Sequence, residues 1–137
     1  MRCVFFFFPF EWGLLYIFLG FYTLTVVPSF YLHIRYFIKN RGTVCRISPD
    51  RLCISKNGKE QIIERTDIEE IVICKSASIE NGGIPITPME AYFFVSIFDK
   101  AGNRYDLTCL LDKKIDKTIK LLGQVPTFVD RGFFNYV

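Results

Sequence analysis

The stretch WGLLYIFLGFYTLTVVPSFYLHI, residues 12–34, contains no Asp, Glu, Lys or Arg, and it sets the organisation of the chain. As an α-helix these 23 residues would extend about 34 Å at 1.5 Å per residue, slightly more than the roughly 30 Å hydrocarbon core of a bilayer. Aromatic residues that favour the membrane interface lie near its two ends: Trp12, Tyr16, Tyr31 and Tyr36. The sequence therefore predicts a membrane anchor in residues 1–40, with a single span at about residues 12–34.

The apolar residues 3–10 that precede the span are too few to cross a bilayer alone. Pro9 and Glu11 disfavour one straight helix through both stretches, so we expect an interfacial segment that leads into the span. A second span that includes residues 3–10 is an alternative. A cleaved signal peptide fits less well, because the apolar run is long and no small-x-small cleavage site follows it. A buried core helix of a soluble protein is a third alternative.

Basic residues around the span predict its orientation. His33, Arg35, Lys39 and Arg41 lie at its carboxyl end, whereas Arg2 and Glu11 lie before it. Because cytoplasmic flanks of membrane spans carry the excess of Lys and Arg, we expect a single-pass protein whose C-terminal domain is cytoplasmic.

The composition argues against several classes of chemistry. The chain has 17 Lys and Arg against 14 Asp and Glu, a net charge of +3, which is not the basic stripe of a nucleic-acid-binding protein. No two of the five cysteines have Cys-x-x-Cys spacing, and His33 is the only histidine, so we expect no zinc site and no His-based catalytic set. Glu69 and Glu70 are neighbours on a predicted strand and point to opposite faces. We therefore expect no enzyme, no metal and no cofactor.

The cysteines fall mostly in apolar or alternating segments, where a reduced thiol acts as a small hydrophobic group. They are Cys3, Cys45, Cys53, Cys74 and Cys109. We expect the last four to be core residues of a cytoplasmic domain, and a disulfide only if the predicted orientation is wrong.

Six segments between Gly42 and Cys109 have the alternating or continuous apolar pattern of strands bounded by turn residues. They are residues 43–48, 51–55, 60–65, 68–74, 91–98 and 104–109. Asn57-Gly58 is the strongest hairpin signal, because a type I′ turn needs two positive φ angles. A single helical turn is an option at the start of the fourth strand. Residues 75–90, with three turn residues at 81–83 and two prolines, predict a long loop.

A helix is predicted from Asp112, a plausible N-cap, to Gly123, a plausible end. Ile115, Ile119 and Leu122 recur at i, i+4 and i+7 and form one apolar face, which must lie on the sheet because so short a helix is marginal alone. The fold class is thus α+β, mainly β.

The chain divides into an anchor (1–40), a β-rich domain (41–123) and an aromatic tail (124–137). For the tail we consider three placements: packed on the sheet, in contact with the bilayer surface, or loose.

The order of anchor, antiparallel strands and C-terminal helix resembles that of bacterial pleckstrin-homology-like domains that follow a membrane-spanning helix. The resemblance covers residues 42–123. It rests on Cys45-Arg46-Ile47-Ser48, Leu52-Cys53-Ile54-Ser55, Asn57-Gly58, Asp67-Ile68-Glu69-Glu70-Ile71 and the helix after Cys109. It implies a bent antiparallel sheet or partial barrel of six or seven strands capped by the helix. The family has seven strands, so the seventh would lie in residues 75–90, or the match is looser.

The resemblance and the missing catalytic groups together predict a non-catalytic, membrane-anchored module for protein–protein contact or assembly, with an unidentified protein or a second copy of the chain as partner. One alternative is a sensor of anionic lipid headgroups that uses a basic helix face or the aromatic tail. The basic residues of that face are Lys113, Lys114, Lys117 and Lys120, for which an ordinary solvated helix face is the favoured interpretation. Another alternative is an accessory subunit of a transporter or secretion complex, recognised through its span.

Overall fold

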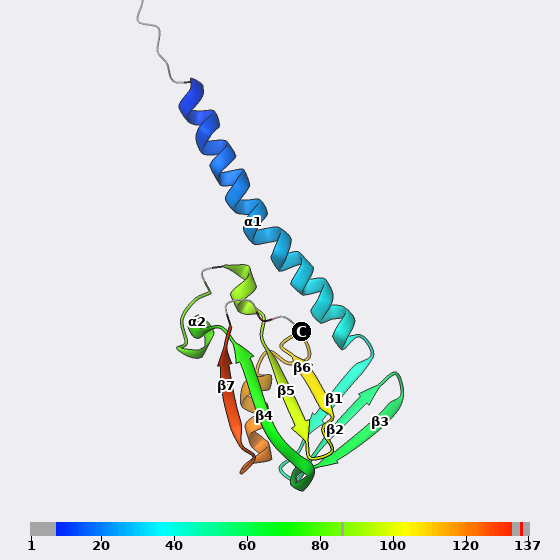
Figure 1. Ribbon diagram of the computed structural model, residues 1–137. Coiled ribbons are helices and arrows are strands. Elements are labelled where there is room, and N and C mark those ends of the chain that lie inside the picture. The colour runs from blue at the N-terminus through cyan, green and yellow to red at the C-terminus, as the bar shows by residue number, and fades with distance from the viewer. Residues whose placement is uncertain (1–7, 86, 133–134, 136–137) are drawn as a thin grey trace, which may run out of the picture.

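The computed structural model describes residues 8–85, 87–132 and 135, which form one long helix and a small sheet domain at its carboxyl end (Figure 1). The helix α1 spans Phe8–Asn40. It begins at Phe8 and includes Pro9 and Glu11, so neither residue interrupts it. Proline is tolerated in the first helical turn, where its missing N–H would have no intrahelical partner. Residues 3–7 lie outside the described part of the chain.

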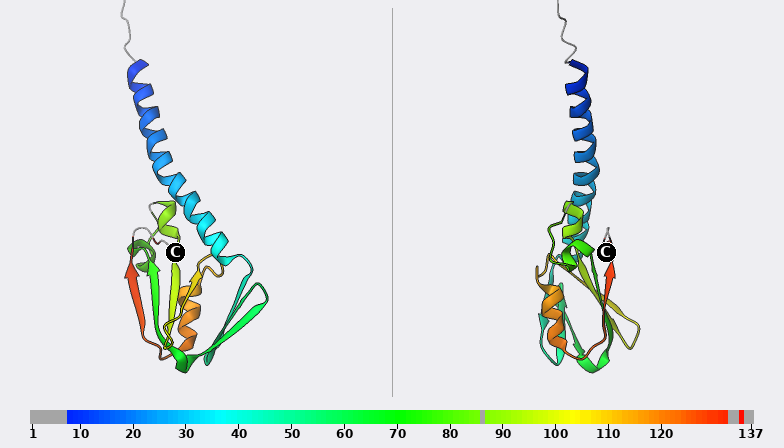
Figure 2. Two further views of the ribbon diagram at one scale, coloured as in Figure 1. Left: turned by 45° about the vertical axis from the view of Figure 1, so that its right-hand side comes forward. Right: turned by 90° about the vertical axis from the view of Figure 1, so that its left-hand side faces the viewer.

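The helix changes direction along its length (Figure 2). Pro28 lies inside α1 and has no amide hydrogen to donate to the preceding turn, which is a common cause of a bend. One residue later, the hydroxyl of Ser29 donates a hydrogen bond of 2.6 Å to the carbonyl of Thr25. From this point onward α1 lies against the sheet domain.

The first sheet contains β1 (Thr43–Ile47), β2 (Arg51–Lys56) and β3 (Lys59–Glu64), all antiparallel and in that order. The turn between β2 and β3 is confirmed: Asn57 has φ 51° and Gly58 has φ 79°, as a type I′ turn requires. The single turn η1 (Arg65–Asp67) then leads into the second sheet, as the sequence allowed.

The second sheet has the order β6-β5-β4-β7. Its strands are β4 (Ile68–Lys75), β5 (Phe94–Asp99), β6 (Arg104–Thr108) and β7 (Thr127–Arg131). The seventh strand is not in residues 75–90, which contain the short helices α2 (Ala77–Glu80) and η2 (Pro88–Ala91). It lies in the tail, where β7 pairs with β4 in parallel. The parallel pair is possible because α3 and η3 carry the chain back to the start of β4 (Figure 1).

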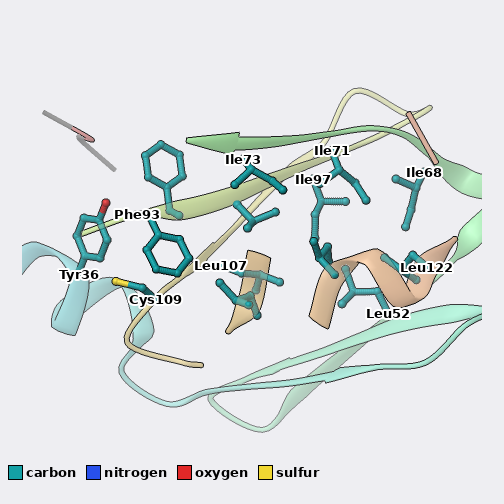
Figure 3. Close-up of a cluster of buried hydrophobic side chains, with 14 of the residues drawn as sticks. Tyr36, Leu52, Ile68, Ile71, Ile73, Phe93, Ile97, Leu107, Cys109 and Leu122 are labelled. Carbon is teal, nitrogen blue, oxygen red and sulfur yellow. The ribbon is translucent and has the colours of Figure 1, made fainter. Parts of the chain in front are cut away.

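A short helical segment closes the core between the two sheets. It consists of α3 (Ile115–Thr118) and η3 (Ile119–Leu122), which contact β5 of one sheet and β1 of the other (Figure 3). Ile115, Ile119 and Leu122 are buried, which confirms the predicted apolar face. The carboxylate of Asp112 accepts hydrogen bonds from the Lys114 amide and the Thr118 hydroxyl, and Gly123 ends the segment at φ 71°. The α+β, mainly β fold with a C-terminal helix is confirmed; the sheets do not close into a barrel.

Candidate functional site

The C-terminal half of α1 is part of the core of the sheet domain. Leu32 and Tyr36 have no exposed surface, and Ser29 is also buried. These residues share one helix face, since they are spaced three and four apart. The part of α1 that precedes Ser29 differs from this docked half, because its large apolar side chains are exposed. They are Trp12, Leu14, Leu15, Tyr16, Ile17, Phe18, Leu19, Phe21, Tyr22, Leu24 and Val27. The helix thus has an unpacked part, residues 12–28, and a docked part, residues 29–40.

Tyr36 is the central contact of the docked part. Its ring meets the ring of Tyr92 edge-on, with centroids 5.2 Å apart, and that of Phe94 at 6.5 Å. Its hydroxyl donates a hydrogen bond of 2.8 Å to the backbone carbonyl of Asn135. In return, the side-chain amide of Asn135 donates to the carbonyl of Tyr92 at 3.0 Å. Figure 3 shows Tyr36 beside Phe93 and Cys109 at one end of the core.

A partly buried carboxylate, Asp106 on β6, makes a second set of contacts to α1. It accepts hydrogen bonds from Lys39 Nζ at 3.0 Å, Ser96 Oγ at 2.7 Å and Arg104 Nε at 2.7 Å. Burial opposes ionisation of Asp106, but these three donors outweigh it and hold the pKa of the carboxyl below its usual range. The last residue of α1, Asn40, also donates to the Thr108 hydroxyl. The helix end is therefore held by charge-assisted bonds as well as by packing.

A groove of about 530 Å³ lies next to the docked part of α1. Its lining residues are His33, Pro88, Ala91, Tyr92, Phe93, Cys109, Leu110 and Lys113. Phe93 and Cys109 are buried, whereas Leu110 and Lys113 are exposed. On the α1 side, His33 Nδ1 lies 2.9 Å from the hydroxyl oxygen of Tyr92. The groove is thus mainly apolar, and the helix itself supplies one wall.

The four lysines singled out from the sequence are all exposed, but they do not lie at one level. Lys113 borders the groove beside α1. Lys114, Lys117 and Lys120 follow along α3 and η3, which run away from α1 to the opposite end of the domain (Figure 1). Lys114 and Lys120 are separated by roughly 9 Å along the helical axis at 1.5 Å per residue. A flat membrane surface that contacts Lys113 and Lys114 therefore does not contact Lys120.

Other reactive groups in the described residues do not gather into a site. No three His, Cys, Asp or Glu side chains among them are placed to hold a metal ion. Cys45, Cys53, Cys74 and Cys109 are free thiols, and Cys3 lies outside the described part. Burial, helped by nearby Cys53, raises the pKa of Cys45 to about 11, and burial also raises that of Cys109. Neutral thiols of this kind are poor nucleophiles and poor metal ligands.

The bent two-sheet domain closed by a helix has the architecture of a pleckstrin-homology module, and comparison with known families agrees. A family model described as a PH domain matches residues 2–117, so the chain belongs to the PH domain family. The match includes α1 and the strands β1 to β6, and it ends before β7. Neither the curated proteins nor the solved structures gave a significant match. PH domains are interaction modules for proteins or lipids and are typically non-catalytic.

Sequence reasoning did not find the contact between α1 and the domain. Leu32 and Tyr36 are spaced as one buried face, but exposed apolar residues such as Phe30, Ile34 and Phe37 surround them. A helix that is apolar on all sides gives no periodicity to read. The sequence feature that could have indicated this contact is the polar end of the helix, Lys39 and Asn40. These two side chains need hydrogen-bond partners once the helix is docked.

Proposed function

We propose that the chain is a single-pass membrane protein that holds its PH domain at the cytoplasmic surface, where the domain makes protein–protein contacts. The observation that carries this proposal is the division of α1. From its first residue, Phe8, to the end of the unpacked part at Pro28, α1 is about 31 Å long at 1.5 Å per residue, which matches the roughly 30 Å bilayer core. By length and composition α1 is able to cross a membrane.

This division shifts the proposed span toward the N-terminus, from residues 12–34 to about residues 8–28. Residues 29–36 pack against η2 and the sheets, whose polar backbone and ionised Asp106 network would be costly to place in lipid. His33, Arg35, Lys39 and Arg41 then all follow the span, and this supports the cytoplasmic placement of the domain.

The outer edge of β7 is the surface we propose for protein contact. β7 is the terminal strand of its sheet, and only β4 pairs with it among the described strands. Phe128 and Val129 on this strand are 55% and 42% exposed. An open strand edge with exposed apolar side chains can accept an extended segment of another chain as an added strand. The partner is an unidentified protein or a second copy of this chain.

The anchor is tested with a matched pair of substitutions in the full chain. Phe18 lies in the middle of the proposed span and Phe37 on the docked part, and both are exposed in the structure. Phe18→Arg places a charge at the bilayer centre, at a cost of about 2.5–3.5 kcal/mol, and should weaken resistance to alkaline carbonate extraction. Phe37→Arg should extract like the unmodified protein. Complete extraction of the unmodified protein would rule out the anchor.

The contact surface is tested by a photo-crosslinking residue at Phe128 in intact membranes, with Ala101 in the exposed β5–β6 turn as control. Two differently tagged copies of the chain distinguish self-association from a different partner. The proposal expects a discrete adduct from position 128 alone. Equal adducts at both positions, or none, would remove β7 as the contact surface.

A further inference from the structure

We propose that the outer edge of β7 binds the extended segment that directly follows a membrane span of a different protein in the same membrane. The segment leaves the bilayer and lies antiparallel to β7. This inference rests on the proposed anchor and on the proposed contact at β7, and it names the class of partner for that contact. The partner segment carries a basic residue close to its span and an apolar residue two positions later.

The pairing of β7 with β4 determines which hydrogen-bonding groups of β7 face outward. The Ile71 amide donates to the Pro126 carbonyl at 2.9 Å, in the parallel register that pairs Ile71 with Thr127. Successive residues of a strand direct their N–H and C=O groups to opposite sides, so the groups of Phe128 and Asp130 face β4, like those of Pro126. The backbone groups that face the outer edge are those of Thr127, Val129 and Arg131.

β7 runs toward the membrane. It begins after η3, at the end of the domain that is remote from α1, and its last residue, Arg131, donates to the Glu80 carboxylate of α2 at 2.6 Å. The helix α2 contacts η2, which in turn contacts α1. Figures 1 and 2 show β7 pointing back along α1 in each view. Because Lys39 and Asn40 are hydrogen-bonded to β6, this direction is fixed relative to the proposed span.

A second copy in the same membrane cannot supply the added strand from its own β7. Both β7 strands would run toward the bilayer, and a two-fold axis along the membrane normal would place Val129 opposite the same residue of the other copy. The N–H groups of both residues would then face each other, whereas a parallel ladder pairs a residue that faces its neighbour with one that faces away. The residues that follow the span in a second copy, 29–40, are also unsuitable, because they are helical and docked.

A different chain that has just crossed the membrane has the required direction. Its residues run away from the bilayer, opposite to β7, and therefore form an antiparallel pair with it. Antiparallel pairing is slightly more stable per residue than parallel pairing. In strand addition of this kind the main-chain bonds provide affinity and the alternate side chains provide specificity. The partner thus needs an extended segment that matches the five residues of β7.

The side chains of Phe128 and Asp130 determine the chemistry of that segment. Arg131 is paired with Glu80, whereas Asp130 makes no ion pair within the described part of the chain. In an antiparallel register centred on Val129, Asp130 lies opposite a residue near the span, and Phe128, which is 55% exposed, lies opposite the residue two positions later. A Lys or Arg opposite Asp130 and an apolar residue opposite Phe128 form favourable cross-strand pairs. Cytoplasmic flanks of membrane spans are rich in Lys and Arg, which agrees with this pattern.

The test places the full chain in dioleoyl phosphatidylcholine vesicles together with a model peptide, a leucine–alanine span followed by Thr-Lys-Val-Phe-Thr. A second peptide has the same span followed by the reversed order, Thr-Phe-Val-Lys-Thr, and a third has the first segment without a span. A photo-crosslinking residue replaces Thr127, which is exposed at the start of β7, and mass spectrometry locates the adduct. Val129→Pro removes an amide hydrogen from the outer edge, and Val129→Ala, the matched control, keeps it. Thermal melting verifies that each variant is folded.

We expect an adduct on the last threonine of the first peptide, because that residue lies opposite Thr127 in the antiparallel pair. The reversed peptide and the peptide without a span should give lower yields. Val129→Pro should reduce the yield about fivefold, the effect of one hydrogen bond, and Val129→Ala should leave it unchanged.

An adduct on the first threonine, equal yields from the first two peptides, an adduct between two copies of the chain, or no adduct would overturn this inference. The crosslink from Phe128 in intact membranes shows separately whether β7 is a contact surface. Carbonate extraction shows separately whether the anchor has failed.

Discussion

The hydroxyl of Tyr36 in α1 donates a hydrogen bond of 2.8 Å to the backbone carbonyl of Asn135, so two residues 99 positions apart join the helix to the end of the chain. Both residues are buried. Asn135 therefore lies where the helix enters the core. The helix and the sheets form one packed unit at this point, through the ring of Tyr36 as well as its hydroxyl.

Substitution of Tyr36 separates these two contributions. Tyr36→Phe removes one buried hydrogen bond and should lower the free energy of unfolding by about 1 kcal/mol. Tyr36→Ala also removes a fully buried ring and should lower it by about 3–5 kcal/mol. Thermal melting of the full chain in detergent, followed by circular dichroism of the sheets, measures both. Similar losses from the two variants would show that the ring packing is not the main contribution.

Asp106 should make the junction sensitive to acid. Its folded-state pKa is lowered, so its stabilisation is present above the unfolded-state pKa of about 4 and is lost as pH falls through the folded value. Asp106→Asn keeps the shape but removes the charge, and should cost about 1–3 kcal/mol near pH 7. The measurement is melting temperature against pH from 7 to 3. The variant should lose part of the decline seen below pH 4, and an unchanged profile would contradict this role.

The helical segment between the sheets offers a matched pair for core packing. Ile119 is 1% exposed and Leu121, two residues later, is 55% exposed. Ile119→Asp buries an unpaired carboxylate and should unfold the domain, whereas Leu121→Asp should melt near the unmodified protein. Circular dichroism at 25 °C and on heating provides the readout. A folded Ile119→Asp variant would show that the segment does not need its apolar face.

The thiol of Cys45 should react slowly in the folded protein. Its pKa is raised to about 11, mainly by burial, compared with about 8.5 for a free thiol. At pH 7.5 the thiolate population, and with it the alkylation rate, should be roughly three hundredfold below that in the denatured chain. Peptide mapping after timed iodoacetamide treatment measures this rate. Comparable rates in folded and denatured protein would show that Cys45 is accessible and ionised.

The local features of the fold were readable from sequence wherever a residue type or a period dictates geometry. Asn57-Gly58 specifies a turn with positive φ, and the spacing of Ile115, Ile119 and Leu122 specifies one buried face. β7 was not readable as a strand, because its five residues are all exposed at a sheet edge and lack a buried alternation. Its strand character comes from pairing with β4, a contact that local sequence does not encode.

The candidate site was harder to predict than the fold. Lys113 was among the four lysines that the lipid-sensor alternative would use, but nothing in the sequence distinguished it from Lys120. The distinction comes from the groove, which residues of α1, η2 and the loop after β6 form only when the chain is folded. That lipid contact at these lysines remains a prediction.

The turn from α1 into β1 contains only Arg41 and Gly42, and the two helix residues before it, Lys39 and Asn40, are hydrogen-bonded to β6. Such a short and docked connection makes the helix and the β domain move together. A helix that tilts to match a thinner or thicker bilayer must swing the whole β domain through a similar angle. Bilayer thickness would then set which edge of the domain faces the lipid and which faces the cell interior.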